Sequence, residues 1–248
     1  MIIIKSPREI DLMRISGEIA AEALILGGSA VKPGVTTKEL NDIMHNFIKS
    51  KQAKPSFLGY GGFPACACIS VNETVIHGIP NNRIIVDGDI VSIDIGVLLD
   101  GYHADTAATF GAGKISDEAQ KLIDTTKVCL ERGIAQALNN NRVGDIGSAV
   151  QEYAEKNGFS VVRDFVGHGV GTQLHEEPSI PNYGKRSRGS RLTTGMTIAI
   201  EPMINAGSFE IKTEKDGWTI NTVDKKLSAH FEHTIVITDN EPLILTSL

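Results

Sequence analysis

The sequence contains few cysteines and few aromatic residues. Among its 248 residues there are three cysteines, at positions 66, 68 and 129, and one tryptophan, Trp218. So few cysteines fit a reducing compartment and exclude a disulfide-dense scaffold. Because no second cysteine pair accompanies Cys66-Ala67-Cys68, a zinc knuckle is excluded too.

The sequence also lacks a long apolar run and a concentration of positive charge. No apolar run approaches the roughly 18 residues of a transmembrane helix, and the stretch Met1–Lys5 is too short for a signal peptide. The net charge is −6, with lysines and arginines spread along the chain, so no nucleic-acid footprint is present. The short basic loop Lys185–Arg191 is more simply a solvated loop than a contact for an acidic partner. We expect a cytoplasmic protein that binds neither nucleic acid nor membrane.

Helix-start signals occur in two pairs along the chain. Ser6-Pro7-Arg8-Glu9 and Thr36-Thr37-Lys38-Glu39 are capping boxes that open two helices, the first reaching about Gly28. Two further helices are expected over about 116–138 and 144–158, each before a second set of strands. With 41% hydrophobic residues the chain can bury a sizeable core. The pattern predicts an α+β fold in one domain spanning 1–248, with helices covering one face of a curved, mostly antiparallel sheet.

Four acidic residues lie inside runs that otherwise resemble β-strands. The acids are Asp94, Asp105, Glu201 and Glu232, and the runs are residues 90–95, 102–107, 196–201 and 230–235. Strands disfavour acids, and a buried charge is tolerated when it is paired or binds a metal. Together with His168 they form an oxygen-rich ligand set that suits Mn, Fe, Co or Zn. Two divalent cations are the simplest explanation.

The chain repeats this pattern once. Each half contains His-x-x-Pro, then a glycine six positions before a strand acid, then His-x-acid. The two copies are His77–Pro80, Gly88–Asp94 and His103–Asp105, and His175–Pro178, Gly195–Glu201 and His230–Glu232. Two facing copies of one unit would bring the four carboxylates to a shared axis.

These segments resemble the type I methionine aminopeptidases nearly end to end. The segments that carry the resemblance are Val71-Asn72-Glu73, His77–Pro80, Asp94–Gly96, Gly101–Asp105, Gly167–Gly171, His175–Pro178, Ile200–Met203, Asp216–Trp218 and Phe231–Thr234. The resemblance implies a pseudo-twofold "pita-bread" fold and a bacterial-type, minimal enzyme without an N-terminal extension. Glu201 follows His168 by 33 positions, which leaves little room for the insertion of type II members.

The resemblance also implies a reaction. Asp105 and Glu232 would bridge two divalent ions (Co, Mn, Fe, Zn or Ni), Asp94 would complete one site, and His168 and Glu201 the other. A hydroxide activated by both ions would attack the amide after the N-terminal methionine, with Glu201 as the candidate base. The substrates would be nascent polypeptides and peptides with a small second residue. We also expect the protein to be a monomer and to have the ribosome as a further partner.

Two histidines have implied catalytic roles. His175 would stabilise the oxyanion and His77 would position the scissile amide, although both could be turn residues before proline. His103 and His230 could support ligands or play a surface role.

The methionine pocket, by the same resemblance, is lined by Tyr60, Phe63, Cys68, Trp218 and His77. Phe57, Gly61 and Leu174 stand where relatives commonly carry cysteine, histidine and phenylalanine. Phe57 either narrows the pocket or packs in the core, and Trp218 could be a core aromatic.

Two alternatives remain for the activity. An Xaa-Pro hydrolase would share this site, and a non-catalytic peptide-binding protein would be expected to have lost metal ligands.

Overall fold

The computed structural model describes residues 1–248 and contains four α-helices in two pairs. The helices are α1 (Pro7–Ser29), α2 (Thr37–Ser50), α3 (Asp117–Ala135) and α4 (Val143–Lys156). Both predicted capping boxes are present, because Ser6 and Thr36 each accept from the backbone of the glutamate three residues on. The predicted helix ends agree to within a few residues. None of the helices is long and apolar enough to cross a membrane.

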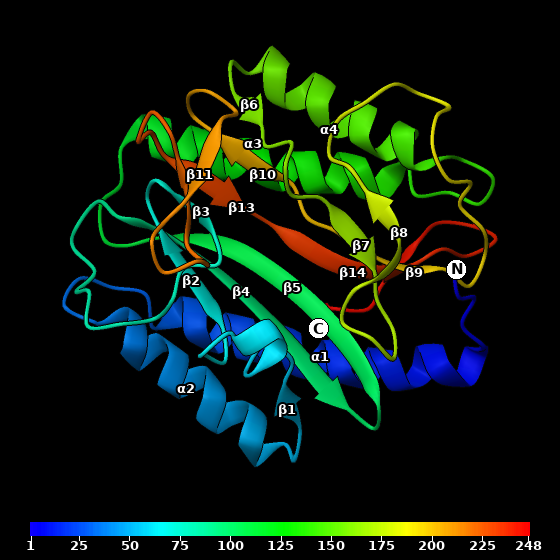
Figure 1. Cartoon of the computed structure of the whole chain (residues 1–248), viewed down its shortest axis with the longest axis horizontal. Helices are drawn as coiled ribbons and strands as arrows, with labels where there is room; N and C mark the ends of the chain where they lie inside the picture. The colour runs from blue at the N-terminus through cyan, green and yellow to red at the C-terminus, as the bar shows by residue number, and fades with distance from the viewer.

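A curved antiparallel sheet occupies the middle of the molecule. Its strands are β1 (Lys54–Pro55), β2 (Cys68–Val71), β4 (Ile90–Leu99), β5 (Tyr102–Gly111), β7 (Gly167–Gly169), β8 (Glu176–Ile180), β9 (Thr197–Ile200), β14 (Glu232–Val236) and β15 (Leu243–Ile244). The order is β1-β4-β5-β14-β9-β7-β8, with β2 on β4 and β15 on β14. In Figure 1 the long strands β4 and β5 cross in front of α1, with the pair α3 and α4 on the opposite side of the view. This is the predicted α+β arrangement.

Two small antiparallel sheets flank the large one. The first has the order β13-β10-β6 and consists of β6 (Ser160–Val161), β10 (Met203–Asn205) and β13 (Ser228–His230). The second has the order β11-β12-β3 and consists of β3 (Thr74–Ile76), β11 (Ile211–Thr213) and β12 (Ile220–Thr222).

Alternation along β4 separates the core from the site. Val91, Ile93, Ile95 and Val97 are fully buried in a core cluster with the apolar faces of α1 and α2. Because side chains alternate between the faces of a strand, Asp94 points to the other face. A second core cluster joins α3 and α4 to β9 and β14. Each helix pair therefore covers one half of the sheet and leaves its opposite face to the acids.

The fourth predicted strand, residues 230–235, is wrong as a single element. The chain leaves the small sheet after β13 and enters the large sheet at Glu232, the first residue of β14, with Phe231 between them. The Phe231 side chain packs against the core under α3. The third run is also shorter than predicted, because β9 ends at Ile200 and Glu201 follows it.

Threonine side chains join the central strands β5 and β14. Thr234 Oγ1 accepts from Asp105 N at 2.9 Å and donates to Asp105 O at 2.8 Å. Thr106 Oγ1 donates to Glu232 O at 2.9 Å. Backbone pairing between these strands extends only over Glu232–Ala107 and His233–Thr106. The hydroxyls therefore replace backbone bonds at the point where the two halves meet.

The Thr234 hydroxyl should stabilise this junction measurably. Thr234 is fully buried, so Thr234→Val leaves the Asp105 N–H and C=O without partners. We expect a loss of about 1–3 kcal/mol in the free energy of unfolding, measured by urea denaturation of the metal-free protein. Thr234→Ser, which keeps the hydroxyl, is the control and should lose less. Equal stability of the Val variant and wild type would contradict this role.

Candidate metal centre and adjoining pocket

The two long strands place three of the acids on one face. Asp94 on β4 and Glu232 on β14 each pair with Ala107 of β5, one from either side, and Asp105 pairs with Gly96. Alternation puts Asp105 on the same face as Ala107, two residues along β5. The residues paired with these acids, Ala107 and Gly96, are small, and Ser56 and Phe57 pack against Gly96.

The second half of the chain supplies His168 and Glu201. His168 lies in β7, and its Nε2 is 3.6 Å from Glu201 Oε1. One ligand atom each of Asp105, His168 and Glu232 lie within 4.8 Å of one another. All five predicted ligands line one cavity. The structure therefore brings together residues that are up to 138 positions apart (232 − 94).

Burial makes all four acids resist ionisation. It raises the pKa of Asp105 and of Glu201 to about 8, and for Asp105 the nearby Glu201 adds to the shift. Burial, and next the charge of Asp105, raise the pKa of Asp94 and of Glu232 well above the usual range. Without a cation, several of these groups hold protons at neutral pH.

The histidine ring of the set is held neutral. Burial lowers the pKa of His168 to about 3, and the neighbouring His175 lowers it further. His168 Nδ1 lies 2.9 Å from Gly169 O, which can only accept, so Nδ1 carries the proton. Nε2 then presents its lone pair toward Glu201, as a metal-ligating imidazole requires.

Several buried polar atoms here have no protein partner. Asp94 Oδ1, Asp105 Oδ1 and Glu232 Oε1 are buried and make no hydrogen bond. An unpaired buried carboxylate oxygen is costly unless a cation binds it. The donor set, four carboxylates and one imidazole, therefore fits divalent metal ions. Asp94, Asp105, His168, Glu201 and Glu232 are the residues that would hold them.

An apolar pocket adjoins the acids within the same cavity of about 390 Å³. Every predicted pocket residue lines it, namely Phe57, Tyr60, Phe63, Cys68, His77 and Trp218. The rings of Phe63 and Trp218 meet edge to face with centroids 5.2 Å apart. Cys68 is opposite Asp94 in the β2–β4 pair, so its thiol lies where the pocket meets the acids. Burial, and next the charge of Asp94, raise the pKa of that thiol, so it stays protonated.

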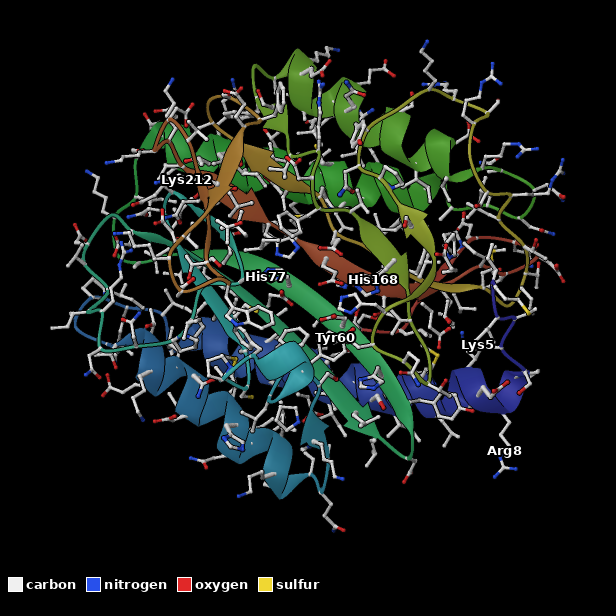
Figure 2. All side chains as sticks on the ribbon, viewed as in Figure 1. Lys5, Arg8, Tyr60, His77, His168 and Lys212 are labelled. Atoms are coloured by element: carbon white, nitrogen blue, oxygen red, sulfur yellow. The ribbon has the colours of Figure 1, made fainter.

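His77 and His175 approach the cavity from the two halves. His77 has φ = 57°, a strained conformation for a residue other than glycine, and its ring meets Phe165 edge to face at 5.5 Å. His175 Nδ1 lies 2.7 Å from Tyr60 Oη, and its ring centroid is 4.2 Å from that of His168. Figure 2 shows Tyr60, His77 and His168 close together in front of the sheet. Burial lowers the pKa of His77 to about 4 and also lowers that of His175.

Phe57, Gly61 and Leu174, the three departures from the family pattern, all lie at this pocket. Phe57 and Leu174 line the cavity and also belong to one buried cluster, so the inward and core placements of Phe57 are both partly realised. Gly61 has φ = 55°, and a Cβ there would lie 3.3 Å from the Trp218 ring. A larger residue at position 61 would have to push that ring aside.

The sequence did not predict several of the residues that line the cavity. Ile76, Asp164, Phe165, Val166 and Ser179 also line the cavity. The available signal was proximity in sequence, since Phe165 and Val166 come directly before the segment of His168. His230 is buried, and its unpartnered Nε2 lies 3.6 Å from Glu201 Oε2, so it adjoins one of the predicted ligands. His103 does not line the cavity, and its Nδ1 is 2.8 Å from Ser56 Oγ.

Known proteins are similar to this chain in both sequence and fold. The family model for metallopeptidase family M24 matches residues 11–239. A methionine aminopeptidase of Clostridium perfringens is 55% identical over 246 residues, which cover 99% of each chain. The crystal structure of a methionine aminopeptidase from Rickettsia prowazekii superposes with a TM-score of 0.98 at 46% identity, covering all of both chains.

A prolidase from Pyrococcus furiosus has a similar fold with lower sequence identity. It superposes with a TM-score of 0.81 at 24% identity, covering 99% of this chain and 66% of the prolidase chain. That likeness shows the shared pita-bread fold alone. The family model over residues 11–239 and the relative that is 55% identical over nearly the whole chain show the family. The chain belongs to metallopeptidase family M24 and, within it, to the methionine aminopeptidases.

Proposed function

We propose that residues 1–248 act as one catalytic unit that removes the N-terminal methionine of nascent chains whose second residue is small. The observation that carries the proposal is the set of unpartnered buried carboxylate oxygens of Asp94, Asp105 and Glu232 beside an apolar pocket. Both halves of the chain supply site residues, which supports a single unit. The family membership and the close relatives named above support the activity.

The acids and His168 would hold two divalent ions in this proposal. In the strand order β4-β5-β14-β9-β7, Asp105 and Glu232 come from the middle strands, so they would be shared by both ions, with Asp94 on one side and His168 and Glu201 on the other. When bound, the ions supply an activated water and polarise the scissile carbonyl. Glu201, whose carboxylate would also contact one of the ions, is the residue we assign as proton acceptor.

The two cavity histidines bind and orient the peptide. Both are held neutral by burial, so each can donate one N–H to the substrate. Tyr60 can donate its hydroxyl proton to His175 Nδ1, and Nε2–H is then free to donate to the carbonyl oxygen. That bond would strengthen as negative charge develops on the oxygen. His77, whose ring packs against Phe165, is the residue we assign to the scissile amide.

The pocket selects the first side chain by shape. Phe57, Phe63 and Trp218 provide an apolar wall beside the Cys68 thiol, which suits an unbranched thioether side chain. The second residue of the substrate has to fit next to the acids and His168, which favours a small side chain.

The proposal extends to partners and location. Nascent N-termini emerge at the ribosome in the cytoplasm, so we infer a cytoplasmic enzyme that associates with ribosomes transiently, which co-sedimentation tests. The site is complete within one chain, which supports a monomer.

Substrate selectivity tests the activity directly. Purified protein with Mn²⁺ should release methionine rapidly from Met-Ala-Ser and Met-Gly peptides. Release should be at least about tenfold slower when the second residue is Leu, Lys or Glu, because the larger side chain cannot sit beside the acids. An acetylated N-terminus is the control and should block release. Preferential cleavage of Xaa-Pro dipeptides would instead assign an Xaa-Pro hydrolase.

The metal-free protein should lose stability as pH rises from about 6.5 to 8. The folded-state pKa values of Asp105 and Glu201, about 8, lie above their unfolded values near 4, so their stabilising contribution disappears as pH rises toward 8. The pKa values of His168 and His230 are lowered to about 3, and their contribution is complete above about pH 6.5. Between about pH 6.5 and 8, only the buried acids therefore change the stability of the metal-free protein.

Mn²⁺ should raise the Tm more at pH 8 than at pH 6.5, because protons no longer compete for the carboxylates. Thermal denaturation with and without metal measures both effects. Asp105→Asn should weaken both the pH dependence of stability and the Mn²⁺-induced rise in Tm. Asp11→Asn, which changes an exposed acid of α1, should alter neither effect. A Tm independent of metal at both pH values would refute the metal centre.

A further inference from the structure

One ion pair in this structure is fully buried. Lys5 Nζ contacts Glu176 Oε2, and the two side chains are only 2% and 4% exposed. Every other pair between a lysine or arginine and an acid has both side chains at least 34% exposed. Lys5 does not line the cavity. The Lys5–Glu176 pair is therefore the only lysine or arginine ion pair that is shielded from solvent.

The pair connects the N-terminal segment to the turn that carries His175. Glu176 is the first residue of β8 and directly follows His175. Its other oxygen, Oε1, accepts from Gln173 N at 3.2 Å, so the same carboxylate also closes the turn. Lys5 is itself fixed, because its backbone N–H donates to Gly195 O at 2.8 Å. Figure 2 shows Lys5 at the side of the site, near the start of α1.

Gly171 provides the space that the pair occupies. A Cβ at this position would lie 2.5 Å from both Glu176 Oε1 and Lys5 Cε. Gly171 O accepts from His103 N at 2.8 Å, which attaches the start of the turn to β5. The turn 171–176 is thus held at its start by a backbone bond and at its end by the buried ion pair.

The hydrogen bond that orients the His175 ring comes from a more exposed element. Tyr60, which bonds His175 Nδ1, is 46% exposed and lies in the 3-10 turn Tyr60–Gly62. Gly59, Gly61 and Gly62 in and beside that turn all have positive φ. Besides the β7–β8 pairing of Gly169 with Glu176 and the neighbouring His168 ring, the buried constraint on the position of His175 therefore comes from the Lys5–Glu176 pair.

We propose that Lys5 is a positioning residue for His175. Its ammonium group holds the Glu176 carboxylate and so places the His175 imidazole within reach of the substrate carbonyl oxygen. A buried ion pair adds little net stability but can fix one geometry among several. This inference rests on the proposed function, in which His175 donates to that oxygen.

The first test replaces Lys5 with an apolar side chain of similar length. Lys5→Met should lower kcat for Met-Ala-Ser by about 10–100-fold, because a displacement near 1 Å is enough for such a loss. KM should change less than about twofold, since the pocket is untouched. Lys51→Met, which breaks the partly exposed pair with Glu22 between α1 and α2, is the matched control and should keep wild-type kcat.

A double-mutant cycle separates positioning from a general structural effect. If Lys5 acts through His175, Lys5→Met should cost less than about twofold in a His175→Ala background. The same loss in both backgrounds would overturn the proposal, as would wild-type kcat in Lys5→Met alone.

If Lys5→Met does not fold, the double variant Lys5→Met/Glu176→Gln replaces it in the cycle. The second substitution removes the Glu176 charge that Lys5→Met leaves without a partner. Both tests are read against the wild-type enzyme. An inactive wild type would refute the proposed function, whereas an active wild type with an unaffected Lys5 variant would refute this inference alone.

Discussion

The burial of four carboxyl groups beside one another is the constraint on which the rest of this structure depends. Asp94, Asp105, Glu201 and Glu232 lie on one face of the sheet, and each has a raised pKa chiefly because of burial. Such a group of acids is unfavourable in an empty protein. Bound divalent cations would make the same burial favourable, because each carboxylate would then contact a positive charge. The acid cluster that destabilises the metal-free fold would thus be the basis of the chemistry.

The rest of the fold can be understood as support for that cluster. The helix pairs bury the opposite face of the sheet, and Thr106 and Thr234 join the two halves beside the acids. The two cavity histidines, His77 and His175, lie outside the strands, and the buried charge of Lys5 connects the N-terminal segment to His175.

Features that depend on local chemistry were predictable from the sequence. The capping boxes at Ser6 and Thr36 predicted helix starts, and acids within apolar runs indicated a metal site. The break at Phe231 was not predictable, because period-2 alternation continues through residues 230–235 while the chain changes sheets. The Lys5–Glu176 pair was also hidden, because 171 positions separate its members and only the folded chain brings them together.

The position of bound metal tests the central claim most directly. Crystals grown with Mn²⁺ and measured at the manganese absorption edge should show two anomalous peaks about 3.5–4 Å apart. Both peaks should contact Asp105 and Glu232, with Asp94 at one of them and His168 and Glu201 at the other. A cavity without manganese, or manganese bound only at surface acids, would contradict the account.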